Sequence, residues 1–388
     1  MSGARHLYGC RRVHRLQTRD PRRLVPQPDP GGTRLTVSRS TDDIRIGNAR
    51  PLISPWVLAE ELPLPDTLAT RIGTARRDIE AVLGHRDPRV LAIVGPCSVH
   101  DPEALLEFAR RFHELCKPLE DAVLPVLRVY FEKPRTVVGW KGLINDPDLD
   151  GSFHINRGLH LARKVLLDVA RLGLPTASEF LDTTFGQYYA DLVSFGAIGA
   201  RTVESQVHRE LASGLSMPVG FKNGTTGQIG VAIDAIRSAR HSHWFPSLTK
   251  EGTPAILQST GNPHGYLILR GGSQTGPNYG SEAVHDAAVA LAARDLPASL
   301  IVDCSHGNSD KDYRRQAQVI SSLCEQIEQG QRAIRGVMLE SHLVAGNQPV
   351  EPGRPLTYGQ SITDACLALD DTAVLLELLA AAVRKAAL

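Results

Sequence analysis

The feature that most constrains the fold is a regular alternation of apolar, strand-like runs with helical segments from about residue 65 onward. A run such as 90–94 is apolar throughout, which is typical of a strand buried on both faces. Helical spacing follows it, with Leu105, Phe108 and Phe112 on one face. The strand-like runs cover residues 90–94, 124–131, 175–180, 197–201, 218–222, 266–270, 299–304 and 336–340. Eight such runs separated by helices predict a (β/α)8 TIM barrel.

Two segments break this alternation. Residues 1–41 form a basic leader, with nine arginines and two aspartates in the first 40 positions. Its composition predicts a disordered tail, although a transit peptide or a nucleic-acid arm has the same charge pattern. The barrel then covers residues 42–388, with an N-terminal extension at 42–88. Residues 242–264 predict a β-hairpin inserted before strand six.

Composition excludes several classes of protein. A net charge of +1 argues against a general nucleic-acid binder, and the absence of a run of about 18 apolar residues argues against a membrane span. The chain contains none of the sequence motifs of dinucleotide-binding folds, P-loops or HExxH zinc enzymes. Six cysteines without a CxxC pair indicate a reducing, cytoplasmic location.

Four side chains of metal-binding type follow predicted strands or lie in the loops beyond them. They are Cys97, His306, Glu340 and Asp364. Because a parallel barrel brings the C-terminal ends of all its strands to one face, these distant residues are expected to meet there. One thiolate, one imidazole and two carboxylates suit a single first-row divalent ion, Mn²⁺, Fe²⁺, Co²⁺ or Zn²⁺.

Cationic side chains gather at the same strand ends. They are Arg128, Lys133, Arg135, Arg201, Lys222 and Arg270, with Glu179 at the end of strand three. Six cations beside four metal ligands need more negative charge than the protein supplies there. Arginines grouped in this way suit phosphate and carboxylate groups. The sequence therefore predicts a barrel enzyme that binds phosphorylated, carboxylated small molecules next to a catalytic metal.

Several long motifs resemble the type I 3-deoxy-D-arabino-heptulosonate 7-phosphate (DAHP) synthase family. They include GPCSVHDP (95–102), LRVYFEKPRTVVGWKGLINDP (127–147), DCSHGNS (303–309), ESHLVAGNQ (340–348) and YGQSITDAC (358–366). The resemblance begins near residue 42 and continues to the C-terminus. It implies a metal-dependent, aldol-like condensation of phosphoenolpyruvate with erythrose 4-phosphate, the first step of the shikimate pathway of aromatic amino acid biosynthesis.

The resemblance also implies roles for residues. Cys97, His306, Glu340 and Asp364 would hold the metal, and Arg128, Arg201, Lys222 and Arg270 would bind phosphoenolpyruvate. Arg135 and Thr136 of the KPRT motif would bind the sugar phosphate, Lys133 would contact the aldehyde oxygen, and Glu179 would order the site and its water. Ser216 and Phe245 match positions that line an allosteric pocket for an aromatic amino acid. A homo-oligomer, a dimer or a tetramer, is expected.

Two other functions remain open at this stage. One is 3-deoxy-octulosonate 8-phosphate synthase, which uses arabinose 5-phosphate, although the KPRT motif and the hairpin favour the four-carbon sugar. The other is a non-catalytic barrel that senses aromatic amino acids. A further expectation concerns Cys366, two residues after Asp364. In an extended loop such residues point the same way, so Cys366 is expected near Cys97.

Overall fold

The computed structural model describes residues 41–351 and 353–386, so most of the basic leader lies outside the described residues. The chain divides into two units, residues 1–51 and 52–388, and the barrel belongs to the second. Within the first unit, residues 41–51 contain turns but no helix or strand. The unit that contains the barrel therefore starts at Leu52, and the boundary at residue 42 stays a prediction.

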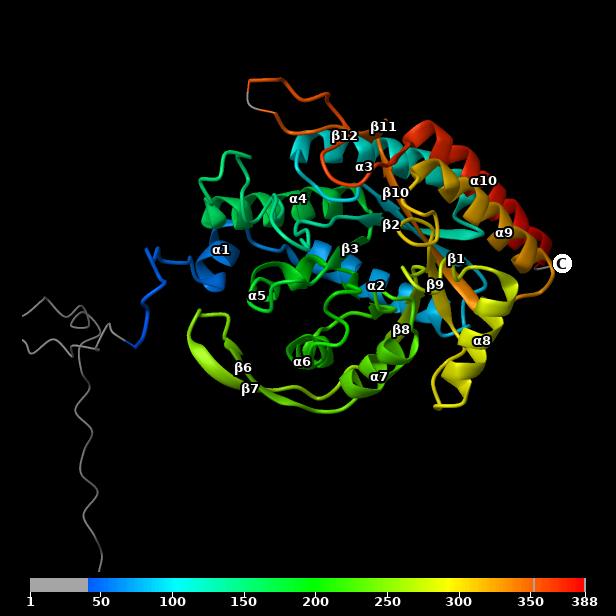
Figure 1. The fold of residues 1–388 in the computed structure, drawn as a ribbon, viewed down its shortest axis with the longest axis horizontal. Helices are drawn as coiled ribbons and strands as arrows, with labels where there is room; N and C mark the ends of the chain where they lie inside the picture. Colours follow the sequence, from blue (N-terminus) through cyan, green and yellow to red (C-terminus); the bar gives the residue numbers. More distant parts are fainter. Residues whose placement is uncertain (1–40, 352, 387–388) are drawn as a thin grey trace, which may run out of the picture. The chain divides into compact units, whose positions relative to one another are not determined.

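The predicted barrel is present (Figure 1). Its parallel strands are β1 (Val90–Gly95), β2 (Val123–Arg128), β3 (Thr176–Glu179), β4 (Phe195–Ile198), β5 (Val219–Lys222), β8 (Gly265–Leu269), β9 (Leu300–Asp303) and β10 (Ile334–His342). They hydrogen-bond in this order, and β1 pairs with β10 to close the barrel. The fold class is confirmed. Strand four, predicted at 197–201, lies earlier because a turn begins at Gly199, whose carbonyl accepts from Thr202 and Val203.

Helices cover the outside of the strands. They are α3 (Pro102–Cys116), α4 (Ile155–Leu172), α5 (Gly186–Tyr189), α6 (Gln206–Gly214), α7 (Gly230–Ala239), α8 (Ser281–Ala292), α9 (Gln316–Glu328) and α10 (Leu369–Ala386). Helices α3, α9 and α10 lie side by side against one part of the barrel (Figure 1). Asp101 caps α3, since its carboxylate accepts from Glu103 N at 2.9 Å and from Ala104 N at 3.2 Å.

Helix α2 (Asp66–Leu83) closes the N-terminal end of the barrel, after the short helix α1 (Pro55–Glu61). The α2 residues Ile79, Val82 and Leu83 are fully buried in the cluster that fills the barrel interior. Arg335, at the start of β10, donates to the carbonyl of Val82 at 2.9 Å. Because α2 covers this end, a ligand can approach the strand ends only from the opposite, C-terminal face.

The predicted inserted hairpin is formed by β6 (Trp244–Leu248) and β7 (Pro254–Gln258). These strands are antiparallel, and Phe245 lies opposite Leu257. Short strands β11 (Val344–Asn347), β12 (Gln360–Ser361) and β13 (Leu367–Ala368) organise the segment after β10. Among the described residues, no helix has the length and apolarity needed to cross a membrane.

Candidate active site at the barrel mouth

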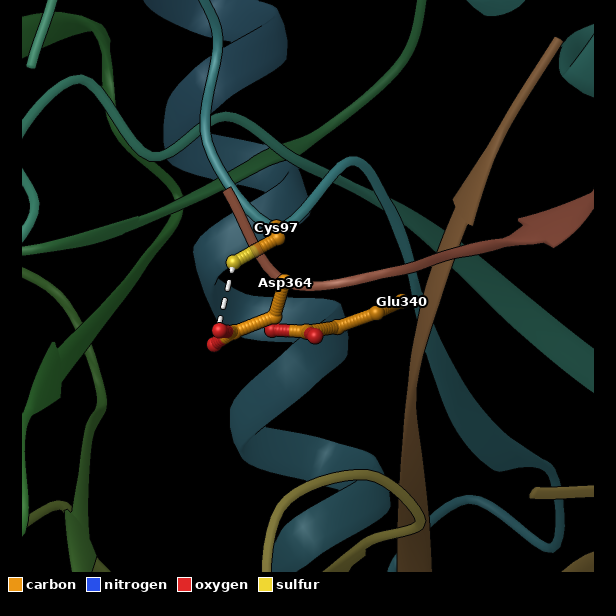
Figure 2. A group of neighbouring side chains, drawn as sticks. All are labelled: Cys97, Glu340 and Asp364. Carbon is orange, nitrogen blue, oxygen red and sulfur yellow. Dashed lines mark hydrogen bonds between the residues drawn. The ribbon is translucent and has the colours of Figure 1, made fainter. Parts of the chain in front are cut away.

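Three of the four predicted metal ligands come together at the C-terminal mouth (Figure 2). One ligand atom each of Cys97, Glu340 and Asp364 lies within 4.8 Å of the other two. The Cys97 thiol donates to Asp364 Oδ2 at 3.6 Å. Figure 2 shows Cys97 and Asp364 entering from loops, and Glu340 reaching across from β10.

Barrel closure brings these residues together. The pairing of β1 with β10 sets Gly95 directly opposite Glu340. Gly95 lies two residues before Cys97, so Cys97 follows close to Glu340. The backbone is tightly packed there, since a Cβ at Gly95 would lie 2.4 Å from the carbonyl oxygen of Arg128. A glycine is required at this position, and the chain can then turn so that the Cys97 side chain lies at the mouth.

The fourth predicted ligand, His306, lies beside this group. Its Nε2 is 3.7 Å from Glu340 Oε1, and its Nδ1 is 3.0 Å from Asp303 Oδ2. The His306 backbone has a φ of 58°, in the left-handed region that L-residues seldom adopt. The Asp303 contact at Nδ1 holds the ring with Nε2 on the side of Glu340, an arrangement common around metal-binding histidines.

Asp303 is a residue that the sequence analysis missed. Its side chain is fully buried, and Oδ2 also accepts from Lys222 Nζ at 2.8 Å. Burial alone would raise the pKa of Asp303, but Lys222 and then His306 hold it well below its ordinary value. One carboxylate therefore orients a predicted metal ligand and a predicted substrate cation. Its position as the last residue of β9 was the available signal.

Lys133 contacts two of the predicted metal ligands. Its Nζ is 2.8 Å from Cys97 Sγ and 2.8 Å from Asp364 Oδ2. Burial, assisted by the charge of Glu340, raises the pKa of Cys97 to about 11 although Lys133 opposes the rise. A metal that binds Cys97 must therefore displace its proton. Two of the predicted ligand atoms thus already contact one cationic group, the Lys133 ammonium.

Arg128 connects the mouth to the barrel interior. It is buried and donates to the carbonyls of Pro96 and Cys97 at 3.0 and 3.1 Å, and to Glu340 Oε1 at 3.0 Å. Its guanidinium lies 3.7 Å from the ring centroid of Tyr130, a cation–π contact. Lys222 Nζ is 5.9 Å from the same ring. Tyr130, which the sequence analysis also missed, thus supports two of the predicted substrate cations.

The outer cations have fewer partners. Among the described residues, Arg135, Arg201 and Arg270 form no ion pair with a carboxylate within 4.0 Å. Arg201 donates to Thr136 Oγ1 at 3.4 Å, and Arg135 donates to the carbonyl of Trp140 at 2.7 Å. Burial lowers the pKa of Arg270, and the like charge of Arg201 lowers it further while Asp303 opposes both. This part of the mouth has excess positive charge.

The remaining predicted residues lie in two places. Glu179 ends β3 and is buried at the mouth. Ser216 is exposed after α6. The Phe245 ring packs against the end of that helix, with Cζ 3.7 Å from the position of a Cβ on Gly214. A separate hollow of about 230 Å³ is lined by Ser54, Trp56 and Glu251. Neither Ser216 nor Phe245 lines that hollow, so their allosteric role stays a prediction.

Cys366 lies beside Cys97, since the Cys97 backbone N–H donates to Cys366 Sγ at 3.4 Å. We predict that metal-stripped protein in air forms a Cys97–Cys366 disulfide and loses activity, and that dithiothreitol with Mn²⁺ restores it. Metal-loaded protein should resist, because the bound thiolate is unavailable. The Cys366→Ser variant should resist oxidation, and the buried Cys324→Ser variant should not. Peptide mapping that finds Cys97 joined to another cysteine would contradict this pairing.

Comparison with known proteins identifies the family. The model of the DAHP synthetase I family matches residues 70–377. The chain is 54% identical over 343 residues to a Trp-sensitive phospho-2-dehydro-3-deoxyheptonate aldolase of Enterobacter agglomerans, covering 88% of this chain and 98% of that protein. A Phe-sensitive relative from Escherichia coli K12 is 53% identical, with coverages of 88% and 97%. A solved aldolase of the same name from Francisella tularensis SCHU S4 superposes with a TM-score of 0.86 at 50% identity, over 88% of this chain and 99% of that one. The chain therefore belongs to the DAHP synthetase I family.

Proposed function

We propose that the residues at the barrel mouth bind and orient both substrates of the reaction that this family catalyses. That reaction joins phosphoenolpyruvate, erythrose 4-phosphate and water to give DAHP and inorganic phosphate, the first step of the shikimate pathway. The observation that carries the proposal is the charge imbalance at the mouth. Among the described residues, Arg135, Arg201 and Arg270 lie there without carboxylate partners. The neighbouring Arg128 and Lys222 do have carboxylate partners, Glu340 and Asp303, but both of these carboxylates also contact His306. Two phosphorylated substrates would supply the missing anions.

The cations divide between the two substrates. Arg128, Arg201, Lys222 and Arg270 surround the strand ends and would hold the phosphate and carboxylate of phosphoenolpyruvate. Arg135 and Thr136 extend outward from the loop after β2 and would hold the sugar phosphate. Fixing both anions places C3 of phosphoenolpyruvate against the aldehyde carbon, an orientation effect worth up to about 7–11 kcal/mol in favourable cases.

Lys133 would then act at the aldehyde oxygen. As C3 of phosphoenolpyruvate forms the new carbon–carbon bond, that oxygen gains negative charge, and the ammonium group stabilises it and can donate a proton to it. The C2 centre becomes electron-poor, and water ordered near Glu179 adds there. The resulting hemiketal phosphate collapses by breaking its bond to the phosphate oxygen, which releases inorganic phosphate.

The residues at the mouth fit a resident divalent metal. Cys97, Glu340 and Asp364 present clustered donor atoms, His306 Nε2 faces Glu340, and Lys133 shows that a cation is accommodated between Cys97 and Asp364. A first-row divalent ion bound here would supply Lewis-acid polarisation of the aldehyde. The thiolate favours Mn²⁺, Fe²⁺, Co²⁺ or Zn²⁺ over Mg²⁺.

The function is tested by measuring phosphate release from phosphoenolpyruvate with erythrose 4-phosphate, or with arabinose 5-phosphate. We expect phosphate release with erythrose 4-phosphate as the second substrate and none with arabinose 5-phosphate. The activity should be lost after chelation and return when Mn²⁺ is added. Cys97→Ala and His306→Ala should each reduce activity by more than about a hundredfold and reduce bound metal, while circular dichroism stays unchanged. Cys324→Ala, a buried cysteine on α9, is the matched control. Turnover by chelator-treated Cys97→Ala protein would refute the metal assignment.

The division of the cations generates a second prediction. Arg135→Ala should raise the KM for erythrose 4-phosphate by about ten- to a hundredfold, the value of a charge-assisted hydrogen bond, and change the KM for phosphoenolpyruvate far less. Arg135→Lys should fall between the wild type and Arg135→Ala, because lysine keeps the charge but lacks the two-pronged donor geometry. Equal rises in both KM values would argue against separate roles.

We propose that an aromatic amino acid inhibits the enzyme through a pocket near Ser216 and Phe245, since two relatives are named Trp-sensitive and Phe-sensitive. Of tryptophan, phenylalanine and tyrosine, at least one should inhibit at millimolar concentration. Ser216→Ala should alter its potency, whereas Ser321→Ala, on the exposed side of α9, should not. If none of the three amino acids slows the reaction, the chain is an unregulated member of the family.

Two further proposals concern assembly and location. The outer face of the hairpin exposes Trp244 and Ile256, which favours contact between copies of the chain in a dimer or tetramer. The described cysteines Cys97, Cys116, Cys304, Cys324 and Cys366 are free and buried, which favours a reducing, cytoplasmic location.

A further inference from the structure

Glu132 is a buried carboxyl group that the roles described above leave unused. It directly precedes Lys133 and is 3% exposed. Its backbone pairs with Gly142 in an antiparallel bridge, and Lys133 N donates to the carbonyl of Lys141 at 2.8 Å. These bonds join the two ends of the loop that carries Lys133, Arg135 and Thr136. Gly142 has a φ of 117°, and a Cβ there would lie 2.1 Å from the Phe131 carbonyl, so the loop base is tightly packed.

The surroundings of Glu132 contain acids but no paired base. Its two carboxyl oxygens each accept from Asp182 N at 3.3 Å. The side chains of Asp182 and Glu179 face it, and both raise its pKa. The buried phenol of Tyr189 is a third neighbour, since burial and then the charge of Glu132 raise the pKa of that phenol. Among the described residues, no lysine, arginine or histidine forms an ion pair with it. The neighbouring Lys133 ammonium contacts Cys97 and Asp364 instead.

A carboxylate in such a place is costly. Removing a charge from water without a compensating cation is unfavourable, and a nearby like charge adds to the cost. Burial raises the pKa of Glu132 to about 8, with Asp182 and Glu179 adding to the rise while the Asp182 N–H opposes it. The least costly form at neutral pH is the protonated acid.

We propose that Glu132 is a positioning residue of this site, held as a neutral carboxylic acid, and that its ionisation disturbs the base of the loop carrying Lys133 and Arg135. When the proton leaves to solvent, the new carboxylate is repelled by Asp182 and by Glu179. Movement away from them displaces the adjoining backbone and hence Lys133, the group placed at the aldehyde oxygen. The effect on Lys133 rests on the function proposed above, whereas the protonation of Glu132 does not depend on it.

The pH dependence of kcat/KM tests the consequence, because it reports groups of the free enzyme. With Mn²⁺ bound, the wild type should lose activity above about pH 8, approaching tenfold per pH unit. Glu132→Gln cannot ionise and should lack this alkaline decline. Asp182→Asn keeps an oxygen that caps Thr184 N and Phe185 N but removes a negative neighbour, so its decline should begin at lower pH. A Glu132→Gln profile that declines as the wild type does would overturn the proposal.

Two measurements need no activity. Infrared difference spectra between about pH 7 and pH 9.5 should show a protonated carboxyl C=O band in the wild type that is absent from Glu132→Gln. Stability should also respond, because the folded chain keeps a proton that the unfolded chain releases near its ordinary pKa of 4.5. Wild-type stability therefore falls as pH rises from about 4.5 to 8, and the Tm advantage of Glu132→Gln should grow over that window.

These results separate the two hypotheses. If the chain lacks the proposed activity but the infrared band is present, the protonation of Glu132 stands and only its consequence fails. If Glu132→Gln does not fold, two measurements still test the proposal. They are the pH titration of the wild-type infrared band and the lower onset pH of the alkaline decline in Asp182→Asn. Absence of a Glu132 carboxylic acid band at about pH 7 would overturn the inference whatever the activity.

Discussion

The pairing of β1 with β10 is the constraint on which the site depends. Without it the strands would form an open sheet, and the loop after β1 would lie far from the end of β10. With it, Gly95 lies opposite Glu340, and Cys97 reaches the same space as Glu340. Asp364 joins them because β13 pairs with the end of β10 and anchors its loop there. Barrel closure thus brings the predicted metal ligands together.

Three ion pairs then organise the charge at the mouth. They are Arg128–Glu340, Lys222–Asp303 and Lys133–Asp364. The first two are almost fully buried, where an unpaired charge would be destabilising by several kcal/mol. Each links a predicted substrate cation to a carboxylate that is a predicted metal ligand or contacts one. The predicted metal ligands and the predicted substrate cations are therefore electrostatically coupled and already oriented, which would lower the reorganisation needed in the proposed reaction.

Sequence reasoning located the residues near the strand ends well, but it missed the side chains that contact those residues. The rule that parallel strands end at one face was enough to bring together Cys97, His306, Glu340 and Asp364, although none is near another in the chain. Arg201 was expected at the end of a strand and lies in the following turn, because the chain leaves β4 at Gly199. Asp303 and Tyr130 were overlooked, since an acid ending a strand and an aromatic in an apolar run have ordinary structural explanations.

The sequence by itself determined the fold class, through local periodicity, and the family, through long motifs that resemble known members. It also determined which residue types stand near the strand ends. The tertiary structure decided which groups touch and which forms they take. Lys133 lies between Cys97 and Asp364, Asp303 holds both His306 and Lys222, and Glu132 is enclosed by acids. Such contacts join residues tens to hundreds of positions apart. Their energies depend on burial and on separations of a few ångströms, quantities that only the packed barrel defines.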